Sequence, residues 1–225
     1  MSELSGGIMP AARLTATPIG VGRFDIMGFD AAAPDHVIGH VGLAVNSVGA
    51  FSAGQTIGVV HMQPPMAAGG HPLEPQACGS VPCTVDETQR INLFVDEQIA
   101  EHEAEGLRWR GYIVRPHAKS EQEADGTTVY RRFSCAGFVV EAYRATELDV
   151  VVTDEDLLPQ FSLDVIERAY PFVRGHARAR AFFGLQGDGP WPVLMPGHIL
   201  HALDRTTEDI RRSPYQPREG DEFFV

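Results

Sequence analysis

The chain of 225 residues is poor in cysteine and aromatic residues, and it has no long hydrophobic run. Three cysteines are too few for a disulfide framework, and their odd number leaves at least one free thiol. Cys78 and Cys83 could pair under oxidising conditions, but two free loop thiols are expected in a reducing cytosol. No stretch approaches the ~18 apolar residues of a membrane span, and residues 1–20 lack the features of a signal peptide. These absences predict a cytoplasmic protein without stable membrane insertion.

Positive charge is also scarce, because 18 Lys and Arg residues face 30 Asp and Glu residues and the net charge is −12. Like charges repel, so this balance argues against binding to nucleic acid or to an anionic membrane. The arginines between Arg108 and Arg115 are interpreted as a solvated face. With 44% hydrophobic and 21% charged residues, the composition is that of an ordinary globular domain with one substantial core.

The chain divides into three predicted parts. Residues 1–18 are expected to form a flexible N-terminal arm, residues 19–205 the folded domain, and residues 206–225 a C-terminal tail that wraps the surface. Residues 64–83 are rich in Pro and Gly and are interpreted as a substrate-covering loop. Thr84 then opens a helix with a capping box to Glu87, and Gly106 ends it.

Strands and helices are predicted on both sides of this first helix, which indicates an α+β fold with an antiparallel sheet. Strands are expected within 22–45, 57–62, 109–118 and 129–133, and a charged turn over 119–126. Further helices are predicted to begin at residue 135 and to cover 163–170 and 196–203. A hairpin that turns near Ala50 and Phe51 would bring His40 opposite His61, and in the appropriate register the two rings share a face.

The strand that carries His40 has small residues on the same face. Alternation along the strand places His40, Gly42 and Ala44 on one face. The other face carries Val41, Leu43 and Val45. Small residues beside a histidine allow a helix to approach closely. We therefore expect a helix to dock on this face.

Cys135 stands at the junction of a predicted strand and an amphipathic helix. A buried small hydrophobe is the common role of a free cysteine. A thiol at a helix N-terminus, however, has its thiolate stabilised by the helix dipole and by free N–H groups, which lowers its pKa. A neighbouring imidazole can then accept the proton, and the Cys135 N–H would be a natural oxyanion donor. Cys135 is therefore predicted to be a nucleophile.

The order His40, His61, Cys135 resembles that of the permuted branch of NlpC-type papain-like cysteine hydrolases, which includes YiiX-like and lecithin:retinol-acyltransferase-like proteins. The segment Cys135-Ala136-Gly137-Phe138-Val139 is similar to the Cys-Ser-Gly-Phe-Val block of NlpC-type enzymes. The segment His61-Met62-Gln63-Pro64-Pro65 is similar to the second-histidine segment of the acyltransferase-like members. The resemblance covers about a third of the chain. It implies a circularly permuted papain-like fold, with an antiparallel sheet packed against the nucleophile helix.

The roles that follow are a nucleophile, a base and an orienting residue. Cys135 would attack, His40 would accept its proton, and His61 would orient His40 through a hydrogen bond. Asn46 and His117 are alternatives for the third role. No role is predicted for the remaining histidines, which are His36, His71, His102, His176, His198 and His201.

No cofactor or metal is expected. A zinc site built from Cys78, Cys83 and His71 is disfavoured, because their spacing is not that of a zinc finger. The expected partner is a small-molecule, peptide or acyl substrate.

The expected function is that of a cysteine hydrolase of amidase, peptidase or esterase type, acting through a thioester on Cys135. An acyltransferase using the same acyl-enzyme is one alternative. The block around Cys135 and the lack of a hydrophobic anchor both lower the case for a membrane-lipid substrate. A non-catalytic binding or regulatory module on this scaffold is a second alternative. A thiol redox sensor, pairing Cys135 with Cys78 or Cys83, is a third.

Overall fold

The fold is known from a computed structural model that combines antiparallel sheets with helices. The described residues are 12–13, 18–30, 37–63, 66, 71–107, 109–175 and 177–224. The predicted N-terminal arm, Arg108, His36, His176 and the Pro64–Pro65 pair therefore lie wholly or mostly outside the described residues.

A six-stranded sheet forms the centre of the described fold, and its strands pair antiparallel throughout in the order β1-β8-β3-β4-β6-β7. In that order the strands are β1 (Ala12–Arg13), β8 (Ala77–Gly79), β3 (Ile26–Asp30), β4 (Ile38–Ala44), β6 (Ile57–Val60) and β7 (His71–Leu73). Three two-stranded sheets surround it, formed by β2 (Ile19–Val21) with β5 (Val48–Phe51), β9 (Ala118–Gln122) with β10 (Thr128–Phe133), and β11 (Gln160–Phe161) with β12 (Trp191–Pro192).

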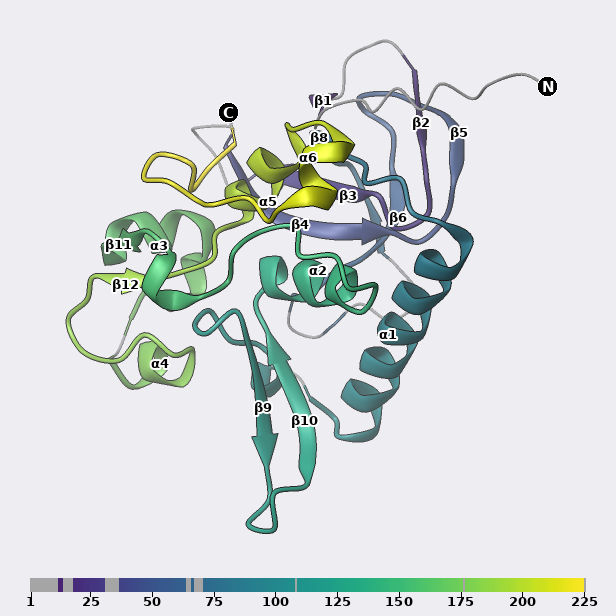
Figure 1. Ribbon diagram of the computed structural model, residues 1–225. Coiled ribbons are helices and arrows are strands. Elements are labelled where there is room, and N and C mark those ends of the chain that lie inside the picture. The colour runs from purple at the N-terminus through teal and green to yellow at the C-terminus, as the bar shows by residue number, and fades with distance from the viewer. Residues whose placement is uncertain are drawn as a thin grey trace.

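The helices surround the sheet and the β9–β10 hairpin projects away from it (Figure 1). The α-helices are α1 (Val85–Ala104), α2 (Cys135–Arg144), α3 (Leu163–Ala169), α4 (Ala177–Phe182), α5 (Pro196–Leu203) and α6 (Thr207–Arg212). Short 3₁₀ helices are η1 (Trp109–Gly111), η2 (Glu155–Leu157) and η3 (Pro171–Val173). No helix in the described part of the chain combines the length and hydrophobicity needed to cross a bilayer.

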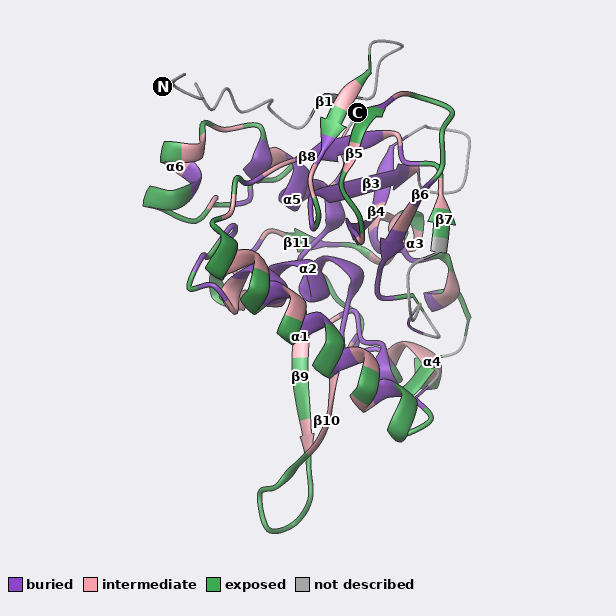
Figure 2. Cartoon of the chain, turned by 90° about the vertical axis from the view of Figure 1, so that its right-hand side faces the viewer, coloured by how far each residue is buried: buried purple, intermediate pink, exposed green. Residues whose placement is uncertain are grey.

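Helix α2 lies at the centre of the molecule and is almost wholly buried (Figure 2). Its apolar side chains share the main core with Val41 and Leu43 of β4. Ala44 belongs instead to a smaller core with Met27 of β3 and residues of β2, β5 and β6. The two faces of β4 therefore face different cores, as the alternation of the sequence predicts.

Three predicted elements are wrong in detail. Residues 109–118 do not form a strand: they begin with η1, and the N–H groups of Val114 and Arg115 both donate to the carbonyl of Phe183. Part of the predicted charged turn is strand β9 of the projecting hairpin. The predicted turn near Ala50 and Phe51 is strand β5, which pairs with β2, although β4 and β6 do pair antiparallel.

Hydrogen bonds and an ion pair connect α1 and the C-terminal tail to distant parts of the chain. The Thr84 hydroxyl accepts from the Glu87 N–H, and the Glu87 carboxylate accepts from the Thr84 N–H, which is the predicted capping box. Glu87 also pairs with Arg211 of α6 at 2.9 Å, so its pKa is held at about 2, chiefly by Arg211. Beyond α6 the carbonyl of Phe224 accepts from Ile38 N–H in β4. The tail is thus bonded to the sheet.

Candidate functional site

Cys135 is the first residue of α2, as predicted. The Ser134 hydroxyl caps the helix by accepting from Gly137 N–H at 2.9 Å, and Ser134 N–H donates to the His117 carbonyl at 3.0 Å. A Cβ on Gly137 would lie 1.8 Å from that carbonyl oxygen. A larger residue than glycine cannot be accommodated there without moving the backbone, so Gly137 fixes how closely the 117–118 segment approaches the nucleophile helix.

The sulfur of Cys135 is fully buried, with polar groups around it. The Tyr170 hydroxyl lies 3.9 Å from Sγ, and the Val41 N–H and the Tyr112 hydroxyl also interact with the sulfur. These groups lower the pKa of the thiol, but burial has the larger effect and raises it above its usual value. The expectation of a lowered pKa is therefore wrong, because the charge-stabilising helix end lies in a dry environment.

His40 and His61 are in direct contact, as the sequence predicts. His40 Nε2 and His61 Nδ1 are 2.8 Å apart, and the two rings meet edge to face. His40 lies in β4, whereas His61 directly follows the end of β6 rather than lying within the strand. The pairs Leu43 with Val60 and Ala44 with Val59, continued by one residue, place His61 opposite Gly42. His61 and His40 then share a face, two residues apart along β4.

The glycine beside His40 makes room for His61, not for a helix. A Cβ on Gly42 would lie 2.7 Å from His61 Cβ and 2.9 Å from the Val60 carbonyl oxygen. Helix α2 shares a core with the other face of β4, through Val41 and Leu43. The expectation that this helix docks on the His40 face is therefore wrong, because α2 packs on the opposite face of β4.

The His40 ring is held neutral. Burial lowers its pKa to about 3, and the neighbouring His61 ring contributes to the same shift. A neutral imidazole can accept a proton, which a general base requires. The hydrogen bond at Nε2 leaves Nδ1 as the other basic atom of the ring.

Cys135, at the start of α2, lies against β4 next to the position of His40. Cys135 contacts the backbone of Val41, the residue that follows His40. Within the described residues, however, no hydrogen bond joins Sγ to either ring of the histidine pair. Strand alternation places the His40 ring on the face of β4 opposite to Val41, and the thiol and the imidazole are not directly paired.

A cavity of about 320 Å³ lies beside this group. Its lining includes His40, Met62 and Gln63 on one side and aromatic side chains on the other, namely Trp109, Tyr112, Tyr170 and Phe172. Tyr112 and Tyr170 also contact the sulfur, so they separate Cys135 from the cavity. The cavity therefore reaches His40 but not the sulfur of Cys135.

The other candidates lie elsewhere. Asn46 is exposed, and His117 Nε2 lies 3.1 Å from Glu141 Oε1 of α2. Cys78 is buried in strand β8 rather than in a loop, and burial raises its pKa to about 12. Cys83 is a partly exposed loop thiol whose pKa is raised to about 11, mainly by burial. All three cysteines are free.

Metal ligands are not clustered in the described part of the chain, where no group of three or more His, Cys, Asp or Glu side chains could hold an ion. The side chain of His71, one member of the disfavoured zinc site, lies outside the description.

Sequence reasoning did not identify Tyr112 and Tyr170 as part of the site. Both are buried aromatic residues next to apolar neighbours, a pattern that indicates ordinary core residues. Their contact with the sulfur depends on tertiary packing between segments far apart in the sequence, which no local pattern records.

No family model, curated protein or solved structure matches this chain.

Proposed function

We propose that the protein is a cysteine hydrolase of amidase, peptidase or esterase type, with Cys135 as nucleophile, His40 as base and His61 as the residue that orients His40. The observation that carries the proposal is the 2.8 Å hydrogen bond between His40 and His61, made beside a thiol at a helix N-terminus. The arrangement is consistent with the permuted papain-like fold that the sequence resembles.

The first step of the reaction would transfer the thiol proton of Cys135 to His40 Nδ1 while the sulfur attacks the substrate carbonyl carbon. The carbonyl oxygen would become an oxyanion, and the Cys135 N–H, which lies in the first turn of α2 where N–H groups lack intrahelical partners, would stabilise it. His40 then gives its proton to the leaving amine or alcohol, and a thioester on Cys135 remains. In the second step His40 takes a proton from water, and the resulting attack releases the acid and restores the thiol.

His61 would fix the tautomer of His40. If His40 Nε2–H donates to His61 Nδ1, His40 Nδ1 is unprotonated and free to act as a base. This is the role of the third residue in triads generally. An acceptor other than water would turn the same intermediate into an acyl transfer.

A non-catalytic module is favoured by one observation, the complete burial of Cys135 with a raised pKa. The two functions differ in the dependence of thiol chemistry on His40. An enzyme acylates Cys135 in a His40-dependent manner, whereas a binding module does not.

The test is single-turnover acylation by an activated ester, followed by mass spectrometry of the intact protein. Cys135→Ala should abolish the adduct, His40→Ala should lower the acylation rate at least 100-fold, and His61→Ala should lower it about 10-fold. Cys83→Ala is the matched control, because it removes a more accessible thiol and should leave the rate unchanged. Equal acylation of the Cys135→Ala and native chains would refute the nucleophile.

A further inference from the structure

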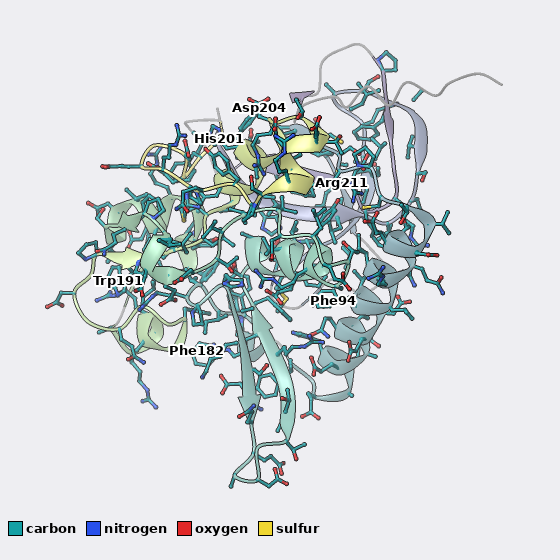
Figure 3. The ribbon with its side chains drawn as sticks, viewed as in Figure 1. Phe94, Phe182, Trp191, His201, Asp204 and Arg211 are labelled. Carbon is teal, nitrogen blue, oxygen red and sulfur yellow. The ribbon has the colours of Figure 1, made fainter. Side chains whose placement is uncertain are left out.

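A second cavity, of about 330 Å³, lies between the β9–β10 hairpin and the end of α4. Its lining carries three cationic side chains, Arg115, Lys119 and Arg132, and one carboxylate, Glu155. Lys119 is the single lysine of the chain. Phe182, which Figure 3 labels near the base of the hairpin, forms part of the wall.

Arg132 is buried and rigidly held in this wall. One terminal nitrogen donates to the carbonyls of Tyr112 and Phe182, both at 2.8 Å, and the other lies 3.3 Å from Glu121. Its guanidinium carbon lies 4.6 Å from the centre of the Phe182 ring. The buried Nε atom nevertheless has no hydrogen-bond partner in the part of the chain that the structure describes. A buried N–H without an acceptor is costly, by about 1–3 kcal/mol.

Arg115 repeats this pattern. It forms an ion pair with Glu155 at 2.7 Å, yet its own buried Nε lacks an acceptor among the described residues. Two guanidinium groups thus line one cavity, and each has an unsatisfied donor. Buried polar atoms are nearly always paired in folded proteins, so the hydrogen bonding of these two arginines is incomplete in the described residues.

The charged side chains that line the cavity would also favour a bound anion. Three cations and one carboxylate line it, and the nearby Glu121, which pairs with Lys119 and Arg132, is not part of the lining. This excess of positive charge occurs in a chain with a net charge of −12. Guanidinium groups favour carboxylate and phosphate oxygens, because the planar donors match their geometry.

From these observations we infer that this cavity is a binding site for a small oxyanion, a carboxylate or a phosphate, held by Arg115, Lys119 and Arg132. The site is independent of the proposed hydrolase. It borders the same 112–116 segment that supplies Tyr112 to the thiol, since Arg132 holds the Tyr112 carbonyl.

The first test measures binding of inorganic phosphate and of succinate to the full chain by isothermal titration calorimetry, with chloride at equal ionic strength as the reference. At least one of the two should bind saturably with one site. Arg115→Gln and Lys119→Gln should each weaken that binding at least tenfold. Arg212→Gln is the matched control, because it removes the same charge from an exposed ion pair on α6 and should leave the affinity unchanged.

Glu155→Gln supplies a test with the opposite sign. Removing this carboxylate frees Arg115 and raises the positive charge of the cavity, so binding should tighten at least threefold. Folding of each variant is checked by the thermal unfolding midpoint.

Lys119 gives a second readout that does not depend on substitution. Because it is the single lysine, acylation by an N-hydroxysuccinimide ester can be followed at one side chain by peptide mass spectrometry. The bound anion should protect Lys119 at least fivefold relative to chloride. Saturable binding of neither phosphate nor succinate, or equal weakening by Arg115→Gln and Arg212→Gln, would overturn the site. Binding of phosphate alone would identify the ligand as a phosphate, and binding of succinate alone would identify it as a carboxylate.

Discussion

Cys135 is buried and His40 is partly buried, and both environments favour the uncharged form of the side chain. Burial raises the pKa of the thiol, and burial together with His61 lowers the pKa of the imidazole to about 3. At neutral pH the pair therefore rests as a thiol and a neutral imidazole, not as an ion pair. Attack on a substrate then needs proton transfer during the step, as for a serine nucleophile.

This protonation state predicts the pH dependence of alkylation. Because the thiolate is the reactive form and the thiol pKa is raised, the rate of Cys135 modification by iodoacetamide should rise about tenfold per pH unit between pH 6 and 8. The measurement uses a chain in which Cys78 and Cys83 are replaced by Ala, so that a single thiol remains. A rate that is already constant from pH 5 upward would indicate a resting ion pair and contradict this assignment.

Gly42 is the second residue on which the site depends. In Gly42→Ala the new Cβ would press on His61 Cβ and on the Val60 carbonyl, so the His40–His61 contact should be lost or displaced. We expect a loss of about 1–3 kcal/mol in the free energy of unfolding and a reduced rate of Cys135 acylation. Urea unfolding and single-turnover kinetics measure the two effects.

Gly49→Ala is the control for this substitution, because a Cβ there meets no atom within 4 Å. It should leave both the acylation rate and the stability nearly unchanged. If Gly42→Ala changed the acylation rate and the stability as little as Gly49→Ala, the close approach of β4 to His61 would not matter for the site.

At the scale of secondary structure, the N-terminus of α2 sets the position of Cys135, the proposed nucleophile. The Ser134 cap is buried, so Ser134→Ala leaves the Gly137 N–H without an acceptor in a dry environment. The free energy of unfolding should fall by about 1–2 kcal/mol, and acylation of Cys135 should slow. Thr206→Ala, at the exposed cap of α6, should cost less stability and leave acylation unchanged. Equal acylation rates in Ser134→Ala and Thr206→Ala would show that the Ser134 cap does not affect the reactivity of Cys135.

Elements with local signals could be predicted from the sequence, and elements defined by distant contacts could not. The capping box of α1 and the apolar pattern of α5 are local, and α5 covers the predicted residues 196–203. Strand β9 has mostly polar, partly exposed residues, so it lacks a core pattern. Tyr112, Ile113 and Val114 are as buried as strand residues, but their segment makes only an isolated bridge to Phe133 of β10 and then bonds to Phe183.

The candidate site divides in the same way. Strand alternation allowed His40 and His61 to share a face, but the sequence left the register open, and the observed β4–β6 pairing decides it. The face on which α2 packs and the burial of the Cys135 sulfur depend on the whole core. The alternation of β4 alone therefore predicted which residues share a face but not which face the helix covers.

On the scale of the whole molecule, the C-terminal tail holds the strand that carries His40. Phe224 bonds to Ile38, and Tyr215 exchanges backbone hydrogen bonds with the segment 150–152. A Cβ on Gly197 of α5 would lie 2.5 Å from the carbonyl oxygens of Asp221 and Glu222, so the tail also runs tightly against that helix. Through these contacts the last residues of the chain help to set the position of β4.

Phe223 is the buried anchor of this tail, with its ring 4.6 Å from the guanidinium carbon of Arg168. Phe223→Ala should lower the free energy of unfolding by about 3–5 kcal/mol. It should also increase amide hydrogen exchange at Ile38 more than at the α1 amides, because the Ile38 N–H donates to Phe224. Phe182→Ala, which truncates a ring that is 43% exposed, is the control and should cost less stability. Unchanged exchange at Ile38 in Phe223→Ala would mean that β4 keeps its position without the tail, and the acylation rate of Cys135 should then also stay unchanged.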